Sequence, residues 1–138
     1  MGRSAVNSLL PMATAGADAR RIGEASAAVW RAIDAALAPV IGARGSAALY
    51  KRSLHLARVS YPLLADVHET GGEPGDFSGL RTVLSRQTAA DAAAAHDALL
   101  HIFHDLLAEL VGGSLTRRLL QSVWEPSSSA DGEQDAPL

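Results

Sequence analysis

The stretch from Asp91 to Val111 constrains the fold more than any other part of this chain of 138 residues. At about 100° per residue, its large apolar side chains fall on an arc that covers roughly half of a helix circumference. These side chains are Leu99, Leu100, Ile102, Phe103, Leu106, Leu107, Leu110 and Val111. Because so wide an arc needs cover from more than one direction, we expect neighbouring helices or a partner subunit to pack on it.

Composition and length indicate a single helical domain. Aromatic residues make up only 4% of the chain, so alanine and leucine must supply most of the packing, as they do in helical bundles. We predict an all-α fold, an up-and-down bundle of four to five helices within residues 18–125. Residues 1–17 are expected to form a flexible arm, and residues 126–138 a disordered acidic tail. The sequence shows no evident internal repeat.

Polar caps and prolines predict the boundaries of the first two helices. Asp18 is suited to cap a first helix. Pro39 should end or bend that helix near Ala38, because proline cannot donate the backbone hydrogen bond that the helix needs, and Gly42 and Gly45 also indicate a corner. Ser46 is expected to cap a second helix, whose regular part continues to about Tyr61 because a proline follows.

The second half of the chain is predicted to contain one unusually long helix. The segment 69–77 gives the strongest loop signal, and no clear break follows within residues 78–111. A continuous helix over 78–111 would be about 50 Å long, roughly twice the length of the second helix. Since this difference leaves surface without cover, we expect a homodimer. Gly112 and Gly113 should end the long helix, and Ser114 should cap a final one.

Charge and residue usage limit the classes of function. Residues 1–68 carry eight basic and four acidic side chains, whereas residues 69–138 carry four basic and eleven acidic ones. With a formal net charge of −3, the chain lacks the basic character that nucleic-acid binding requires. The absence of cysteine fits a cytoplasmic protein. No apolar run approaches the roughly 18 residues of a membrane span, so we expect no membrane partner.

A basic stripe on the second helix is the predicted partner-binding surface. Lys51, His55 and Arg58 fall within about 60° of one another on a helix, and Arg52 is adjacent in sequence. The stripe lies opposite the apolar face, which is also where an ordinary amphipathic helix carries its charges. We expect it to receive an acidic protein partner or the acidic half of the same chain.

A second group of candidate residues combines imidazoles with carboxylates: His96, Asp97, His101, His104 and Asp105. Residues four apart lie side by side on a helix, so a His and an Asp at that spacing are able to share a divalent metal. The Glu-x-x-His spacing of di-iron bundles is missing from the chain. The simpler interpretation is a solvated helix face with weak ion pairs.

The same histidines suggest a phosphate carrier as an alternative. The chain is similar in length to histidine phosphotransfer domains, helical bundles that present a reactive imidazole on a helix surface, where His101 or His104 would also lie. Those domains place lysine and glycine shortly after the histidine, whereas His104 and Asp105 stand at these positions after His101. Without a nearby cation, the Asp105 carboxylate would repel a phosphoryl group.

Neither a catalytic residue nor a cofactor is predicted, because the chain has no Gly-x-Ser-x-Gly motif and no phosphate-binding glycine loop. The sequence favours a small non-enzymatic helical interaction protein, a bacterial signalling or regulatory adaptor that presents helix surfaces to a partner. A phosphotransfer or metal-binding bundle using His101 or His104 is the first alternative. A bundle that holds a buried apolar ligand along the wide apolar arc is the second.

Overall fold

The computed structural model describes residues 8–70 and 74–124, and within these two ranges the chain forms six helices and no strand. The all-α fold class is therefore confirmed, with more helices than the four to five predicted. The predicted tail, residues 126–138, lies outside the described residues. The helices are α1 (Leu10–Thr14), α2 (Ala19–Ala57), α3 (Leu63–Thr70), α4 (Ser78–Ser85), α5 (Ala89–Val111) and α6 (Gly113–Trp124).

The helix α2 consists of two arms that meet at Gly42. Asp18 caps its start as predicted, since the side chain accepts a hydrogen bond from the Arg21 backbone N–H at 2.9 Å. Gly42 has φ 82° and ψ 157°, a conformation that glycine adopts readily and that interrupts the helix. We call residues 19–41 the first arm of α2 and residues 43–57 the second arm.

The first helix does not end at Pro39, and the predicted corner lies at Gly42. Pro39 lies inside α2, and the helix continues to the bend at Gly42. Proline removes one donor, which the carbonyl of Ala35 would otherwise have accepted. Both Pro39 and Ala35 are exposed, so water is able to replace the missing donor. Ser46 is also not a cap: it lies buried within the second arm, where its Oγ donates to Asp34 Oδ1 at 2.8 Å.

The helix predicted over residues 78–111 is interrupted between Ser85 and Ala89. Thr88 caps α5, because its side chain accepts a hydrogen bond from the Asp91 backbone N–H at 3.0 Å. The interruption leaves α5 with 23 residues, the same length as the first arm of α2. The long helix whose length favoured a homodimer is therefore shorter than predicted, and the oligomeric state stays a prediction.

Part of the predicted flexible arm is ordered on α5. The helix α1 lies within residues 1–17, and Leu9 just before it is buried. The Asp97 carboxylate on α5 accepts hydrogen bonds from Ser8 Oγ and from the Leu9 backbone N–H, the latter at 3.1 Å. This anchor lies 88 residues away from Leu9 in the sequence, so local composition gave no sign of it. Residues 1–7 of the arm lie outside the described residues.

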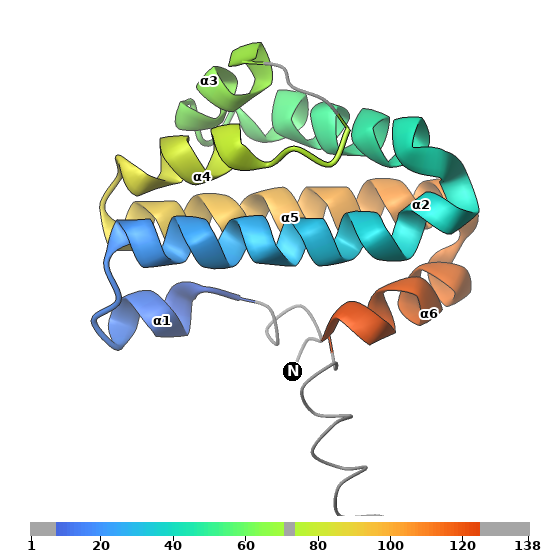
Figure 1. The fold of residues 1–138 in the computed structure, drawn as a ribbon, viewed down its shortest axis with the longest axis horizontal. Coiled ribbons are helices and arrows are strands. Elements are labelled where there is room, and N and C mark those ends of the chain that lie inside the picture. Colours follow the sequence, from blue (N-terminus) through green and yellow to red (C-terminus); the bar gives the residue numbers. More distant parts are fainter. Residues whose placement is uncertain (1–7, 71–73, 125–138) are drawn as a thin grey trace, which may run out of the picture.

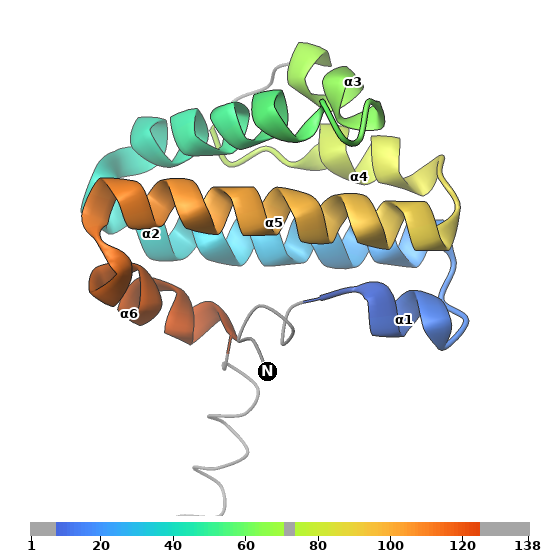
Figure 2. The same ribbon diagram turned by 180° about the vertical axis from the view of Figure 1, so that it is seen from behind.

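The first arm of α2 and α5 lie side by side at the centre of the molecule and run in the same direction (Figure 1). The second arm of α2 and α4 lie on one side of this pair, and α1 and α6 lie on the other side (Figure 2). The helix α3 packs on both α2 and α4. The second arm of α2 and α4 run in one direction, opposite to that of the first arm of α2 and α5 (Figure 1).

The two halves of the fold repeat one arrangement with an offset of 70 residues. The caps Asp18 and Thr88 are separated by this offset, and so are Gly42 and Gly112. Gly112, with φ 92° and ψ 153°, has nearly the same backbone conformation as Gly42 and likewise joins a long helix to a shorter one. The series α1, first arm and second arm of α2 therefore corresponds to α4, α5 and α6, while α3 belongs to the first half alone.

Burial and contacts follow the same offset. Ser26 and His96, which are 70 residues apart, are both buried and lie with Ser26 Oγ 2.7 Å from His96 Nδ1. Such a contact between equivalent positions is expected where two equivalent helices meet at an approximate two-fold axis. At other equivalent positions both residues are buried. These pairs are Ile22 and Ala92, Trp30 and Leu100, Ile33 and Phe103, Leu37 and Leu107, and Ser46 and Thr116. The two residues of each pair differ in type, so the sequence does not show the repeat. The structure shows it because both members of each pair lie in the core.

Replacing Gly42 or Gly112 with alanine is expected to lower the free energy of unfolding by about 1–2 kcal/mol, because a side chain strains the backbone at positive φ. Apart from the adjacent backbone, no atom lies within 4 Å of the place that a Cβ would take at either position, so the loss comes from conformation and not from a clash. Gly113→Ala is the matched control, since Gly113 also has open space but no positive φ. Urea denaturation measures the effect, and equal losses in all three variants would contradict it.

Candidate partner-binding surface

The predicted basic stripe is exposed on the second arm of α2 and on the turn that ends it. Lys51, Arg52, His55 and Arg58 are all exposed, and Arg58 Nε donates to His55 Nδ1 at 3.3 Å. Within residues 8–70 and 74–124, no carboxylate lies within ion-pair distance of Lys51, Arg52 or Arg58. The structure therefore brings the four predicted residues together and leaves the three permanent cations available to a partner.

Two large apolar side chains border the basic stripe. Leu56 is 37% exposed and Val59 is 78% exposed. Leu56 follows Arg52 by four residues, so the two lie side by side on the helix surface. Neither side chain is among the partner-binding residues that the sequence predicted. We refer to Lys51, Arg52, His55, Leu56, Arg58 and Val59 together as the α2 surface.

An aromatic cluster beneath the second arm fixes the position of the α2 surface. Trp30 on the first arm lies 5.2 Å from Tyr50, 6.4 Å from Phe77 and 5.0 Å from Phe103, measured between ring centroids. Tyr50 and Phe77 are themselves 4.9 Å apart in a T-shaped arrangement. Because Tyr50 directly precedes Lys51 in the second arm, this packing sets the direction in which the stripe faces.

The polar tips of the cluster are unusual. Trp30 Nε1 and Tyr50 OH are buried, and neither has a hydrogen-bond partner among the described residues. Burial raises the pKa of the Tyr50 hydroxyl, and the negative charge of Asp76 raises it further. Hydrogen bonds from the Ser78 side chain and backbone lower the pKa of Asp76. Tyr50 is therefore a neutral core residue at physiological pH and adds no charge to the α2 surface.

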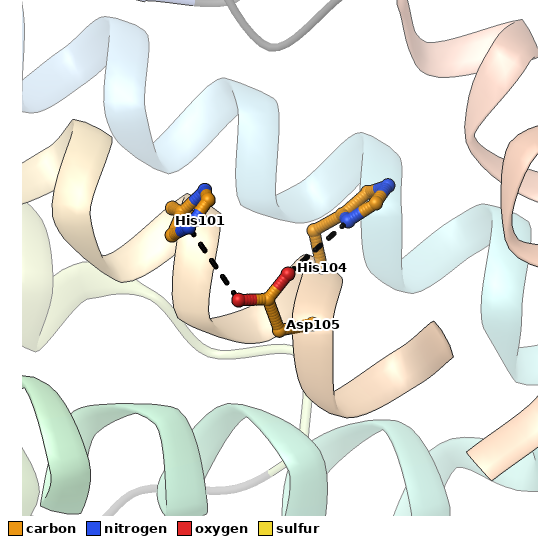
Figure 3. A network of polar contacts seen from close by, with 3 residues as sticks. All are labelled: His101, His104 and Asp105. Carbon is orange, nitrogen blue, oxygen red and sulfur yellow. Dashed lines mark ion pairs between the residues drawn. The ribbon is translucent and has the colours of Figure 1, made fainter. Parts of the chain in front are cut away.

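Three members of the histidine group lie on the exposed face of α5 (Figure 3). Asp105 Oδ2 is 3.4 Å from His101 Nε2, and Asp105 Oδ1 is 3.8 Å from His104 Nδ1. The carboxylate lies between the two imidazoles, and each ring contacts a different carboxylate oxygen (Figure 3). In the part of the chain that the structure describes, no three His, Asp or Glu side chains converge as ligands for a metal ion.

The other two members of the histidine group lie elsewhere. His96 is fully buried against Ser26, and Asp97 anchors the backbone of Leu9. His96 and His101 are five residues apart, which places them about 140° apart around a helix. The sequence spacing suggested one cluster, but its members lie in three places. His96 lies in the core, Asp97 contacts the residue before α1, and the other three members face the solvent.

The wide apolar arc of α5 forms part of the core. Leu99, Leu100, Phe103 and Leu107 are buried there. A shallow pocket of about 290 Å³ lies at another place, beside the turn between α1 and α2. Its lining residues are Met12, Ala15, Gly16, Ala17 and Arg21.

One helix in residues 8–70 and 74–124, α2, is long and apolar enough to cross a membrane by length and composition alone. An 18-residue window within it has a mean hydropathy of 1.2 and is 17% buried. The helix is bent at Gly42, and α3, α4, α5 and α6 pack against it. Core helices of soluble proteins pass the same test, which is therefore a weak indication of membrane insertion.

Comparisons of the chain with protein-family models, with curated proteins and with solved structures find no match. The chemistry of its own surface is thus the basis for a functional proposal.

Proposed function

We propose that this protein is a small non-enzymatic interaction module that binds an acidic, amphipathic segment of a protein partner through the α2 surface. One observation carries the proposal: Lys51, Arg52 and Arg58 are exposed without carboxylate partners in the described residues, next to Leu56 and Val59. A regulatory adaptor of the cytoplasm, acting alone or as a homodimer, fits such a surface.

The residue types of the α2 surface suit a protein partner. Arginine is enriched in protein interfaces because its planar group donates several hydrogen bonds at once to a carboxylate. Lys51 adds a further positive charge that speeds the approach of an acidic segment. Leu56 and Val59 offer apolar area whose burial strengthens the complex. The net charge of −3 disfavours the phosphate backbone of a nucleic acid as the partner.

Selection of peptides from a displayed random library on the immobilised protein tests the proposal. We expect the selected peptides to be rich in Asp and Glu, with apolar residues at helical spacing. The double variant K51E/R52E should weaken the binding of a selected peptide at least about tenfold in fluorescence anisotropy, because it replaces attraction with repulsion. Added salt should weaken binding to the unchanged protein as well.

The variant R117E/R118E is the matched control, since it makes the same change in charge at two exposed positions of α6. It should bind the peptide nearly as well as the unchanged protein. Equal weakening by both double variants, or selected peptides without acidic residues, would contradict the proposal. A phosphorylated His101 or His104 after incubation with acetyl phosphate would instead support the phosphotransfer alternative.

A further inference from the structure

The segment that precedes α2 is held on the core by few side chains. We call residues 8–17, which contain α1, the N-terminal strap. The strap packs chiefly on α5, below the central pair of helices (Figures 1 and 2). None of the five residues of α1 is buried. Within residues 8–17, Leu9 alone is buried, with 6% of its surface exposed. A single large side chain therefore fixes the strap in the core.

The equivalent segment in the second half of the fold is buried more deeply. With the offset of 70 residues, α1 corresponds to α4, which buries three apolar side chains: Leu80, Val83 and Leu84. The residues at these positions in the strap are Leu10, Ala13 and Thr14. Leu10 is 44% exposed, Ala13 is half-buried and Thr14 is exposed. Because buried apolar area stabilises the packing of a helix, the strap is held less strongly than α4.

One carboxylate of α5 holds the start of the strap. The Asp97 side chain accepts hydrogen bonds from Ser8 Oγ and from the Leu9 backbone N–H. Ser8 Oγ also accepts a hydrogen bond from the Leu10 backbone N–H at 3.2 Å, so the same hydroxyl orients the first residue of α1. Since both contacts end on one side chain, a change at Asp97 affects the attachment of the strap at two points.

The other end of the strap has the features of a hinge. Gly16 is exposed and has φ 102°, and apart from the adjacent backbone no atom lies within 4 Å of the place that a Cβ would take there. The shallow pocket of about 290 Å³ lies beside this turn, and its lining includes Met12 of α1 and Arg21 of α2. The turn therefore has room to change direction without displacing core side chains.

We propose that the N-terminal strap opens at Gly16 while the other helices stay folded, and that Asp97 is the side chain that keeps it closed. Opening withdraws Leu9 from the core and uncovers the apolar surface on which Met12 and Ala13 also pack. Segments with few buried apolar contacts open locally in this way. The strap thus controls access to this part of the core. The proposal does not rest on the function of the α2 surface.

Hydrogen–deuterium exchange of the full chain, read by mass spectrometry of its peptides, tests the proposal. We expect the amides of the strap to exchange at least about tenfold faster than those of α4. Low concentrations of urea should change the rates in the strap little and raise those in α5 steeply, because local opening exposes little surface. Strap amides as protected as those of α4, or as sensitive to urea as those of α5, would overturn the proposal.

Asp97→Asn tests the role of the carboxylate. The amide replaces one acceptor oxygen with a donor, so exchange in the strap should become at least about tenfold faster while the rates in α4 stay unchanged. The variant should also bind more anilinonaphthalene sulfonate, a dye that fluoresces on exposed apolar surface. Asp105→Asn is the matched control, since it removes the same charge from the exposed face of the same helix. Equal effects of the two variants, or faster exchange in every helix of Asp97→Asn, would contradict the proposed role of Asp97 and overturn the proposal.

Discussion

Replacing Trp30 with alanine is expected to lower the free energy of unfolding by about 3–5 kcal/mol. Trp30 is 1% exposed and contacts the rings of Tyr50, Phe77 and Phe103. These three residues come from the second arm of α2, the segment before α4, and α5. The substitution removes a large buried side chain and leaves a cavity among segments that cannot all move together to fill it.

Urea denaturation followed by far-UV circular dichroism measures the effect of Trp30→Ala. Arg31→Ala is the matched control, because Arg31 is the next residue of the same helix and is exposed. It should change stability by less than about 0.5 kcal/mol. A loss below about 1 kcal/mol for Trp30→Ala would mean that the aromatic cluster does not hold the second arm in place.

Replacing His96 with alanine is expected to cost about 2–4 kcal/mol. The imidazole is fully buried between the two central helices, and its Nδ1 lies 2.7 Å from Ser26 Oγ. Its removal creates a cavity and takes a hydrogen-bond partner from a buried hydroxyl, which adds the cost of an unsatisfied polar group. Thermal or urea denaturation measures the loss.

A double-mutant cycle isolates the contact between Ser26 and His96. Ser26→Ala in the His96→Ala background should cost less than it does in the unchanged protein, because the hydroxyl has then already lost its imidazole partner. His101→Ala removes an imidazole from the exposed face of the same helix and should have little effect. Costs that simply add in the double variant would show that the two side chains do not stabilise each other.

Periodicity predicted which segments are helical, and most remaining differences arise from contacts distant in sequence. The cap at Asp18 and the end of α5 at Gly112 were readable because each depends on residues within one helical turn. The break before Thr88 was missed although its cap is equally local, because residues 86–88 contain neither glycine nor proline and an alanine-rich stretch follows. Anchoring of Leu9 by Asp97 is a tertiary contact that no local pattern encodes.

The candidate sites differ in how far the sequence defined them. Exposure of Lys51, Arg52, His55 and Arg58 followed from the position of charges on an amphipathic helix. The exposure of Val59 did not follow from this pattern, because that exposure depends on where α2 ends and on what packs beyond that point. The presence of histidines does not by itself show which side of a helix is covered. The burial of His96 is therefore evident only from the packing of the helices in the structure.

The contact between Ser26 and His96 is one that two identical subunits could not make at a symmetry axis. Identical chains present the same side chain from both directions there, so a hydroxyl would face a hydroxyl and an imidazole would face an imidazole. Because both halves belong to one polypeptide here, unlike partners meet at the centre of the molecule. Covalent connection thus allows the two halves to specialise, as the presence of α3 in the sequence of only one of them also illustrates.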